Sequence, residues 1–222
     1  MAKNPESSRE REAGPLRGKD AAKPYGIFLR SVGWLLLKLG GWTATGERPK
    51  AKRLVVVAAP HTSNWDFVWV LAFATQFQLR ISWLGKHTLF KAPFGGFMGW
   101  LGGIPVHRHA KTNLVKELVA TFDKYEALAL TVPPEGTRGQ ADYWKSGFYH
   151  IASGARVPIL LSYLCYESKT GGFGPELWTS DDMGADMDQI RDFYAGKVGK
   201  YPDLSSRMRL REEGEVGSSP IE

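Results

Sequence analysis

The chain has 222 residues, 43% of them hydrophobic and 23% charged, so it is long enough for one full core and short for two generous domains. Lysine and arginine total 29 and aspartate and glutamate total 23, so the net charge is +6, which suits an anionic lipid, a phosphorylated substrate or nucleic acid. There is no basic cluster, helix-turn-helix signal or aromatic RNA-binding motif, which disfavours nucleic acid. The one cysteine, Cys165, excludes an intramolecular disulfide and fits a reducing compartment, and no zinc-type or EF-hand spacing points to a metal.

The N-terminal part divides into a polar and an apolar stretch. Residues 1–24 have almost no large apolar side chains, which predicts a disordered polar tail. Residues 26–42 are strongly apolar, but Arg30 and Lys38 interrupt them and they are too short to span a membrane. We predict an amphipathic helix within residues 25–45, which either lies in the membrane interface or packs on the core.

Short apolar segments then alternate with longer amphipathic ones. We expect strands at residues 53–59, 81–85, 104–108, 128–132 and 157–164. We expect helices at residues 64–79, 111–128 and 144–156, with a glycine-rich connection at residues 93–103. This alternation predicts an α/β domain over residues 46–203, with a mostly parallel central sheet flanked by helices, followed by a polar tail at residues 204–222.

A histidine and an acid follow the first expected strand. His61 lies at its carboxyl end, where sites form in parallel sheets, and Asp66 lies in the first turn of the next helix. A histidine held by a carboxylate is typical of a general base. The alternative is an ordinary helix start, because Ser63 and Asp66 have the spacing of a capping signal.

A second candidate is the segment "PPEGTRG", residues 133–139, at the end of the strand 128–132. Gly136 allows close approach of the backbone to a ligand, and the guanidinium of Arg138 suits a phosphate. The alternative is a surface turn with an ion pair between Glu135 and Arg138. Arg108 ends a third strand and could enlarge an anion site, or it is a solvated charge. Together, these strand ends predict a base beside an anion pocket.

The order of these motifs resembles the glycerophospholipid acyltransferase family, in particular 1-acylglycerol-3-phosphate acyltransferases. Four segments carry the resemblance: "HTSNWD" (61–66), "GGIPVHR" (102–108), "PEGTR" (134–138) and "VPI" (157–159). The resemblance covers about residues 54–164, half of the chain. The resemblance implies the α/β fold of glycerol-3-phosphate acyltransferases.

The resemblance also implies a reaction. His61 would be the general base on the hydroxyl of a lysophospholipid, and Asp66 would orient it. The activated oxygen would attack an acyl thioester of coenzyme A or acyl carrier protein directly, with no cofactor and no metal. The acceptor's polar head would be bound by Arg108, Glu135, Gly136, Thr137 and Arg138, while Val157 and Pro158 would be structural or acyl-facing. The protein would act in phospholipid biosynthesis as a peripheral protein on the cytoplasmic side of the membrane.

Three alternatives stay open on the sequence. The chain could be a catalytically silent lipid-binding or scaffold protein with this fold, although a silent relative would be free to lose His61 and Asp66. It could transfer acyl groups to a different lipid or to a non-lipid hydroxyl. It could also hydrolyse thioesters, but "ASGAR" (152–156) lacks the G-x-S-x-G nucleophile elbow of a serine hydrolase.

Overall fold

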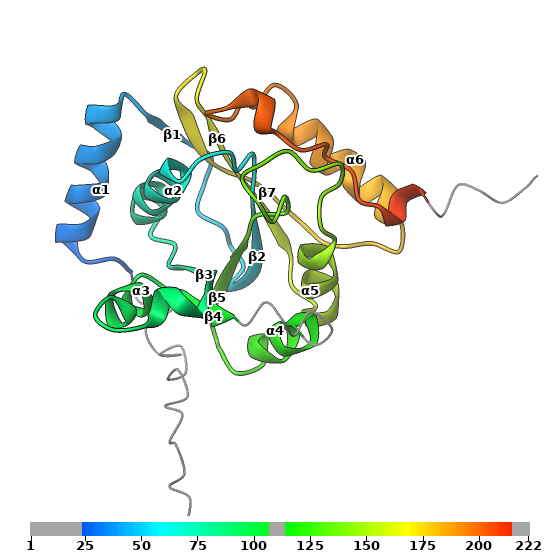
Figure 1. Ribbon diagram of the computed structural model, residues 1–222, viewed down its shortest axis with the longest axis horizontal. Coiled ribbons are helices and arrows are strands. Elements are labelled where there is room, and N and C mark those ends of the chain that lie inside the picture. Colours follow the sequence, from blue (N-terminus) through cyan, green and yellow to red (C-terminus); the bar gives the residue numbers. More distant parts are fainter. Residues whose placement is uncertain (1–23, 107–113, 215–222) are drawn as a thin grey trace, which may run out of the picture.

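The computed structural model describes residues 24–106 and 114–214, in which seven strands form one sheet (Figure 1). The strands are β1 (Thr43–Thr45), β2 (Arg53–Ala58), β3 (Ile81–Lys86), β4 (Gly103–Val106), β5 (Leu128–Val132), β6 (Ile159–Cys165) and β7 (Thr170–Leu177). Their order across the sheet is β1-β7-β6-β2-β5-β3-β4. The strands from β6 to β4 pair in parallel, whereas β7 pairs antiparallel with β6 and parallel with β1. The sheet is therefore mostly parallel, as predicted.

Helices cover both faces of this sheet. They are α1 (Ile27–Gly40), α2 (Trp65–Gln76), α3 (Gly95–Trp100), α4 (Leu114–Phe122), α5 (Gly147–Ala155) and α6 (Met183–Tyr194). Short 3-10 turns are found at His87–Phe90, Pro202–Leu204 and Glu212–Gly214. In Figure 1, α1 and α2 lie on one side of the sheet and α5 and α6 on the other. The arrangement is a three-layer α/β sandwich.

The two faces of β2 explain why its sequence is continuously apolar. Val55 and Val57 belong to the core under α4, α5 and α6, whereas Leu54 and Val56 belong to the core under α2. All four are at most 1% exposed. Side chains along a strand alternate between the two faces, so a strand covered on both faces needs an apolar residue at every position.

The predicted strands all exist, each within two residues of its expected start, but the prediction stopped short of the whole fold. β1, β7 and α6 were not predicted. The helix expected at residues 111–128 ends at Phe122, where a turn leads into β5. The expected tail at residues 204–222 differs as well: Leu210 is fully buried and pairs with Trp144 in an isolated bridge. Residues 1–23, most of the expected N-terminal tail, lie outside the described residues.

Helix α1 packs on the core, which is one of the two alternatives considered for residues 26–42; the membrane-interface alternative stays a prediction. It packs on α2 through a narrow stripe that includes the buried residues Gly33 and Leu37. A Cβ atom on Gly33 would lie 2.1 Å from Oγ1 of Thr75, so only glycine permits this close contact between the helices. The remaining apolar side chains are largely exposed: Ile27, Phe28, Val32, Trp34, Leu35, Leu36 and Leu39. None of the helices in the described ranges is long and apolar enough to cross a membrane.

Candidate active site

His61 and Asp66 meet at the carboxyl end of β2. Their side chains form a contact of 3.1 Å between Nδ1 of His61 and Oδ2 of Asp66. The Asp66 side chain is 3% exposed and that of His61 is 22% exposed, so the acid is shielded while the imidazole reaches solvent. A proton on Nδ1 that points to Asp66 leaves Nε2 as the basic nitrogen. In this geometry a histidine can act as a general base that the carboxylate orients.

Asp66 is held by further donors, which explains how a carboxylate can be buried here. Its Oδ2 also accepts the backbone N–H groups of Thr62 and Ser63, each at 2.9 Å. Its Oδ1 accepts the hydroxyl of Tyr166 at 2.7 Å. These donors offset the desolvation that burial imposes on a polar group. The predicted capping signal is only partly formed: Asp66 accepts the Ser63 N–H, but the N-cap of α2 is Asn64, and the Ser63 hydroxyl accepts the N–H of Trp65 at 3.2 Å.

Tyr166 was not predicted as a site residue. It follows β6 and packs edge-on against Trp42, with the ring centroids 4.9 Å apart. Burial and its hydrogen bond to Asp66 raise the pKa of the Tyr166 hydroxyl well above its usual range. The hydroxyl therefore stays protonated and acts as a permanent donor to Asp66. Nothing local in the sequence signals this contact, because the two residues are 100 positions apart.

Glu135 lies beneath His61 rather than at the surface. Its Oε2 accepts the backbone N–H of His61 at 2.8 Å, and the residue is only 1% exposed. Glu135 is therefore not part of a surface turn with Arg138, and its expected contact with the polar head of an acceptor stays a prediction. Strands β2 and β5 are neighbours in register, with Val57 opposite Val132, so the two loops that follow them leave the sheet side by side. Glu135 joins those loops.

The Glu135 carboxyl group is also electrostatically unusual. Its Oε1 is buried without a hydrogen-bond partner among the described residues. Desolvation raises the pKa of Glu135, and the hydrogen bond from the His61 backbone opposes that shift only in part. Burial of this carboxyl group costs free energy of desolvation, and its Oε2 in turn holds the His61 backbone in place.

The rest of the loop after β5 is exposed and basic. Gly136, Thr137 and Arg138 are all exposed, as expected of groups that meet a ligand. Gly136 has φ +65°, and a Cβ there would lie 2.5 Å from Nζ of Lys145. Lys145 therefore lies against this loop, at Gly136, and brings to it a second cation that the sequence did not predict. Arg108 lies outside the described residues, two positions beyond the end of β4.

Val157 and Pro158 lie at the amino ends of the parallel strands, whereas His61 lies at their carboxyl ends. Val157 is 3% exposed, and the carbonyl oxygen of Pro158 accepts the N–H of Val55 at 3.0 Å. This bond joins the start of β6 to the start of β2. Of the two roles expected for this pair, the structural one fits this position.

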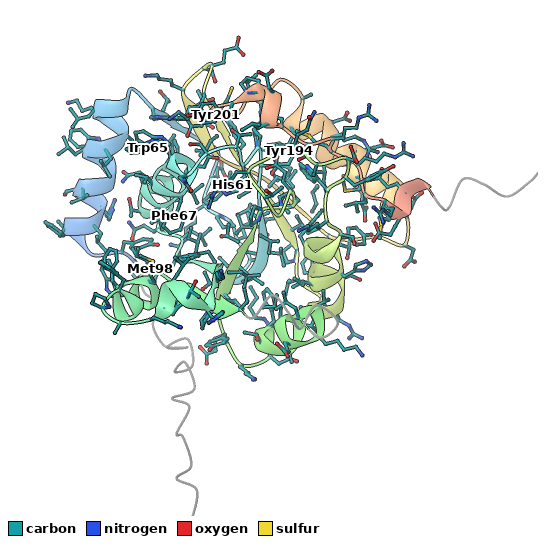
Figure 2. The ribbon with its side chains drawn as sticks, viewed as in Figure 1. His61, Trp65, Phe67, Met98, Tyr194 and Tyr201 are labelled. Atoms are coloured by element: carbon teal, nitrogen blue, oxygen red, sulfur yellow. The ribbon has the colours of Figure 1, made fainter. Side chains whose placement is uncertain are left out.

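A large apolar cavity of about 1010 Å³ lies between α1, α2, β3 and α3. Leu29, Val32, Leu36, Phe67, Val68, Leu71, Phe97, Trp100 and Leu101 are among its lining residues. Phe67, which follows Asp66 in α2, is one of the lining residues, whereas His61 and Asp66 are not, and the lining extends to Tyr125 and Leu128 at the amino end of β5. In the view of Figure 2, Phe67 lies between His61 and Met98, which belongs to α3. Within the described residues, no group of three or more histidine, cysteine, aspartate or glutamate side chains is placed to hold a metal ion.

Comparisons with known proteins bear on this geometry. The family model described as Acyltransferase matches residues 42–161, which is more than half of the chain. The chain belongs to this acyltransferase family. The matched residues include the dyad, the loop after β5 and the start of β6, so the family membership covers the whole candidate site except Tyr166.

A solved structure supports the fold independently. The crystal structure of the 1-acyl-sn-glycerophosphate (LPA) acyltransferase PlsC from Thermotoga maritima is similar to this chain, with a TM-score of 0.52 and 15% sequence identity. The alignment covers 88% of this chain and 80% of that chain. At this level of identity the likeness concerns the fold. No curated protein sequence matches this chain.

Proposed function

We propose that this acyltransferase-family protein moves an acyl chain from a thioester to the hydroxyl of a lysophospholipid such as 1-acylglycerol-3-phosphate. The observation that carries the proposal is the His61–Asp66 contact at the carboxyl end of β2, with Nε2 of His61 left basic and reachable. The acyltransferase family, the basic loop beside the dyad and the adjacent apolar cavity all fit this reaction.

The chemistry needs only a base and a positioned pair of substrates. Nε2 of His61 takes the proton of the acceptor hydroxyl as its oxygen attacks the thioester carbonyl. The tetrahedral intermediate then expels the thiolate, which takes that proton from the imidazolium, and an ester is formed. Asp66 keeps the imidazole oriented and stabilises its charged form. The attack is direct, without an acyl-enzyme, and the donor is acyl-CoA or acyl carrier protein.

The cavity would bind an acyl chain, and the basic loop would bind a phosphate head group. A cavity of about 1010 Å³ is at the upper end of the usual range for small-molecule sites, and its apolar wall suits an acyl chain. Arg138 and Lys145 supply charge for a phosphate head group next to His61.

We further propose that the protein binds the cytoplasmic surface of a membrane peripherally, through α1 and α3. The exposed apolar side chains of α1 are joined by Phe94, Phe97 and Trp100 of the α3 region, and together they exceed what an isolated surface residue would explain. Both helices also line the cavity, so a lipid chain would pass from the bilayer into the site without crossing water.

The test is a turnover assay with purified protein, long-chain acyl-CoA and a panel of lysolipids in detergent, following thiol release and lipid products. We expect thiol release that depends on an acceptor, and a loss of about 10²-fold or more in His61→Ala. The matched control is His150→Ala, an exposed histidine on α5. Thiol release without any acceptor would indicate a hydrolase. Absence of turnover with intact lipid binding would indicate a silent scaffold, and full activity of His61→Ala would refute the mechanism.

A further inference from the structure

The segment that follows α6 is built against the His61 loop. Gly199 packs so closely there that a Cβ atom would lie 2.8 Å from Oγ1 of Thr62. The N–H of Tyr201 donates to that same oxygen at 3.2 Å. On its other side, the carbonyl oxygen of Val198 accepts the N–H of Tyr166 at 2.8 Å. These contacts fix residues 198–201 beside the catalytic loop, although they lie outside the part of the chain that matches the family model.

Lys200, in the middle of this segment, is held between two aromatic rings. Its Nζ lies 5.6 Å from the ring centroid of Trp65 and 5.6 Å from that of Tyr201. Trp65 is 55% exposed and Tyr201 is 48% exposed, so both rings reach solvent and neither is part of the core. Trp65 is the first residue of α2, four positions after His61. Figure 2 shows Trp65, Tyr201 and His61 in the same region of the molecule.

The charge of Lys200 is oriented but not neutralised. Aromatic faces attract an ammonium through their quadrupoles, but they carry no net negative charge. Among the residues that the structure describes, no carboxylate oxygen lies within 4.0 Å of the Lys200 amine. An ammonium that is positioned and lacks a counter-ion is suited to bind an anion at the point it faces.

This cation lies on a different side of the dyad from the loop of Arg138 and Lys145. That loop follows β5, whereas residues 198–201 are bonded to the end of β6, and β5 and β6 flank β2 on opposite sides. Two basic groups therefore bracket His61. A transfer between a phosphorylated donor and a phosphorylated acceptor needs two such groups.

We propose that Lys200, held by Trp65 and Tyr201, binds a phosphate group of one of the two substrates at the mouth of the active site. The proposal rests on the proposed function for the identity of the substrates, but its chemistry is that of phosphate recognition. The phosphate belongs either to the acceptor's head group or to the coenzyme A part of the donor.

Binding titrations on the full chain test this site without requiring turnover. One pair of probes is short-chain lysophosphatidate and the matching monoacylglycerol. The other pair is coenzyme A and pantetheine. Lys200→Met should raise the Kd of the phosphorylated member of at least one pair by roughly three- to tenfold, the effect of one exposed charge pair. The phosphate-free member should bind as before, and the pair that responds identifies the substrate.

Two matched variants complete the experiment. Lys200→Arg should keep most of the affinity, because it keeps the charge between the rings. Lys124→Met removes an exposed lysine from the loop before β5, at the amino ends of the parallel strands. The Lys124→Met protein should bind both phosphorylated probes like the unmodified protein. The proposal is overturned if Lys200→Met binds both phosphorylated probes with unchanged Kd, or if Lys124→Met weakens them equally. A protein that shows the Lys200 effect but no acyl transfer would keep this site and refute the proposed function.

Discussion

The hydroxyl of Tyr166 donates a 2.7 Å hydrogen bond to Oδ1 of Asp66, while the other carboxylate oxygen, Oδ2, contacts Nδ1 of His61. Each oxygen of Asp66 therefore has a side-chain partner, and the carboxylate cannot rotate without breaking one of them. Tyr166 is itself fixed by its edge-on contact with Trp42. The orientation of the proposed base thus depends on a chain of contacts that reaches to the end of α1.

Tyr166→Phe tests this relationship. The ring stays against Trp42, but the donor to Asp66 is lost, which leaves a buried carboxylate oxygen with one partner fewer. Hydrogen bonds to charged groups contribute about 1.5–3 kcal/mol, so we expect kcat to fall by roughly tenfold or more, with KM for both substrates little changed. Steady-state kinetics over both substrates give the split between kcat and KM.

Tyr163→Phe is the matched control for Tyr166→Phe. It removes a hydroxyl from β6, the strand that Tyr166 directly follows, but that hydroxyl contacts Oγ1 of Thr45 and not the dyad. We expect its kcat to equal that of the unmodified protein. Equal losses in the two variants, or a kcat of Tyr166→Phe that is unchanged, would remove Tyr166 from the mechanism.

Glu135→Gln should change how stability depends on pH. Burial raises the pKa of Glu135 above its ordinary value of 4.5, so the folded state binds the proton more tightly than the unfolded state. The free-energy cost of holding this acid ionised in the folded state is absent below pH 4.5. It grows as the pH rises from there through the folded pKa, so the free energy of unfolding falls over that window. Glutamine does not titrate and keeps a carbonyl oxygen for the His61 N–H. Thermal unfolding measured from pH 4 upward should therefore show a smaller decline for the variant.

The comparison for Glu135→Gln is Glu126→Gln, an exposed acid in the loop before β5. This variant removes one negative charge, but from an exposed position. Its stability should therefore decline with rising pH as in the unmodified protein. If Glu135→Gln and the unmodified protein lose stability in parallel across the window, the carboxyl group is not the source of the pH dependence.

The sequence predicted the parts of this site that depend on local pattern. The Val55–Val57 run is apolar because β2 is buried on both faces. This apolar run was enough to predict the strand and the position of His61 at its carboxyl end. Glu135 was predicted as a site residue, but its hydrogen bond to the His61 backbone was not, because no side-chain pattern encodes a backbone N–H as a partner. Strand β7 was missed because its eight residues, "TGGFGPEL", include three glycines and a proline and have no apolar periodicity.

Tyr166 and Lys200 illustrate what local reasoning cannot reach. Tyr166 meets Asp66 because β6 and β2 are neighbours in register, with Ala58 opposite Ser162, which places the end of one strand beside the loop of the other. Lys200 reaches Trp65 only because α6 returns the chain across the sheet. Both contacts are set by topology, and a sequence read without its topology gives no signal for them.

Arg138→Ala should affect the acceptor rather than the donor. Arg138 is exposed on the loop beside the dyad, where its guanidinium can make two parallel hydrogen bonds to a phosphate. We expect KM for lysophosphatidate to rise by roughly tenfold, while KM for acyl-CoA stays the same. The control is Arg48→Ala, which removes an exposed arginine from the loop before β2, at the amino ends of the parallel strands. An unchanged acceptor KM would count against a phosphate site on the loop after β5.

The cavity should set the preferred acyl length. Leu71 of α2 lines it, and Leu71→Trp would narrow it, whereas Leu71→Met keeps nearly the same volume. Each methylene that no longer fits forfeits about 0.8 kcal/mol, or roughly fourfold in kcat/KM for that donor. Measured over a series of saturated acyl-CoA donors, the optimum of Leu71→Trp should move to shorter chains and that of Leu71→Met should stay. A common optimum for both variants, with unfolding temperatures that show both are folded, would place the acyl chain elsewhere.

Removing the exposed apolar surface of α1 should weaken membrane binding without harming the fold. Phe28 is 77% exposed and Leu39 is 78% exposed, so neither contributes to the core. Inserted in a bilayer, each side chain would contribute roughly 1.5–3 kcal/mol, so the double variant Phe28→Lys, Leu39→Lys should lower partitioning into neutral phosphatidylcholine vesicles by about tenfold or more. Co-sedimentation measures this directly, and turnover in detergent should be retained. The control is Ala185→Lys with Gln189→Lys, which adds the same charge at exposed positions of α6 on the opposite face. If both double variants partition alike, the attachment does not run through α1.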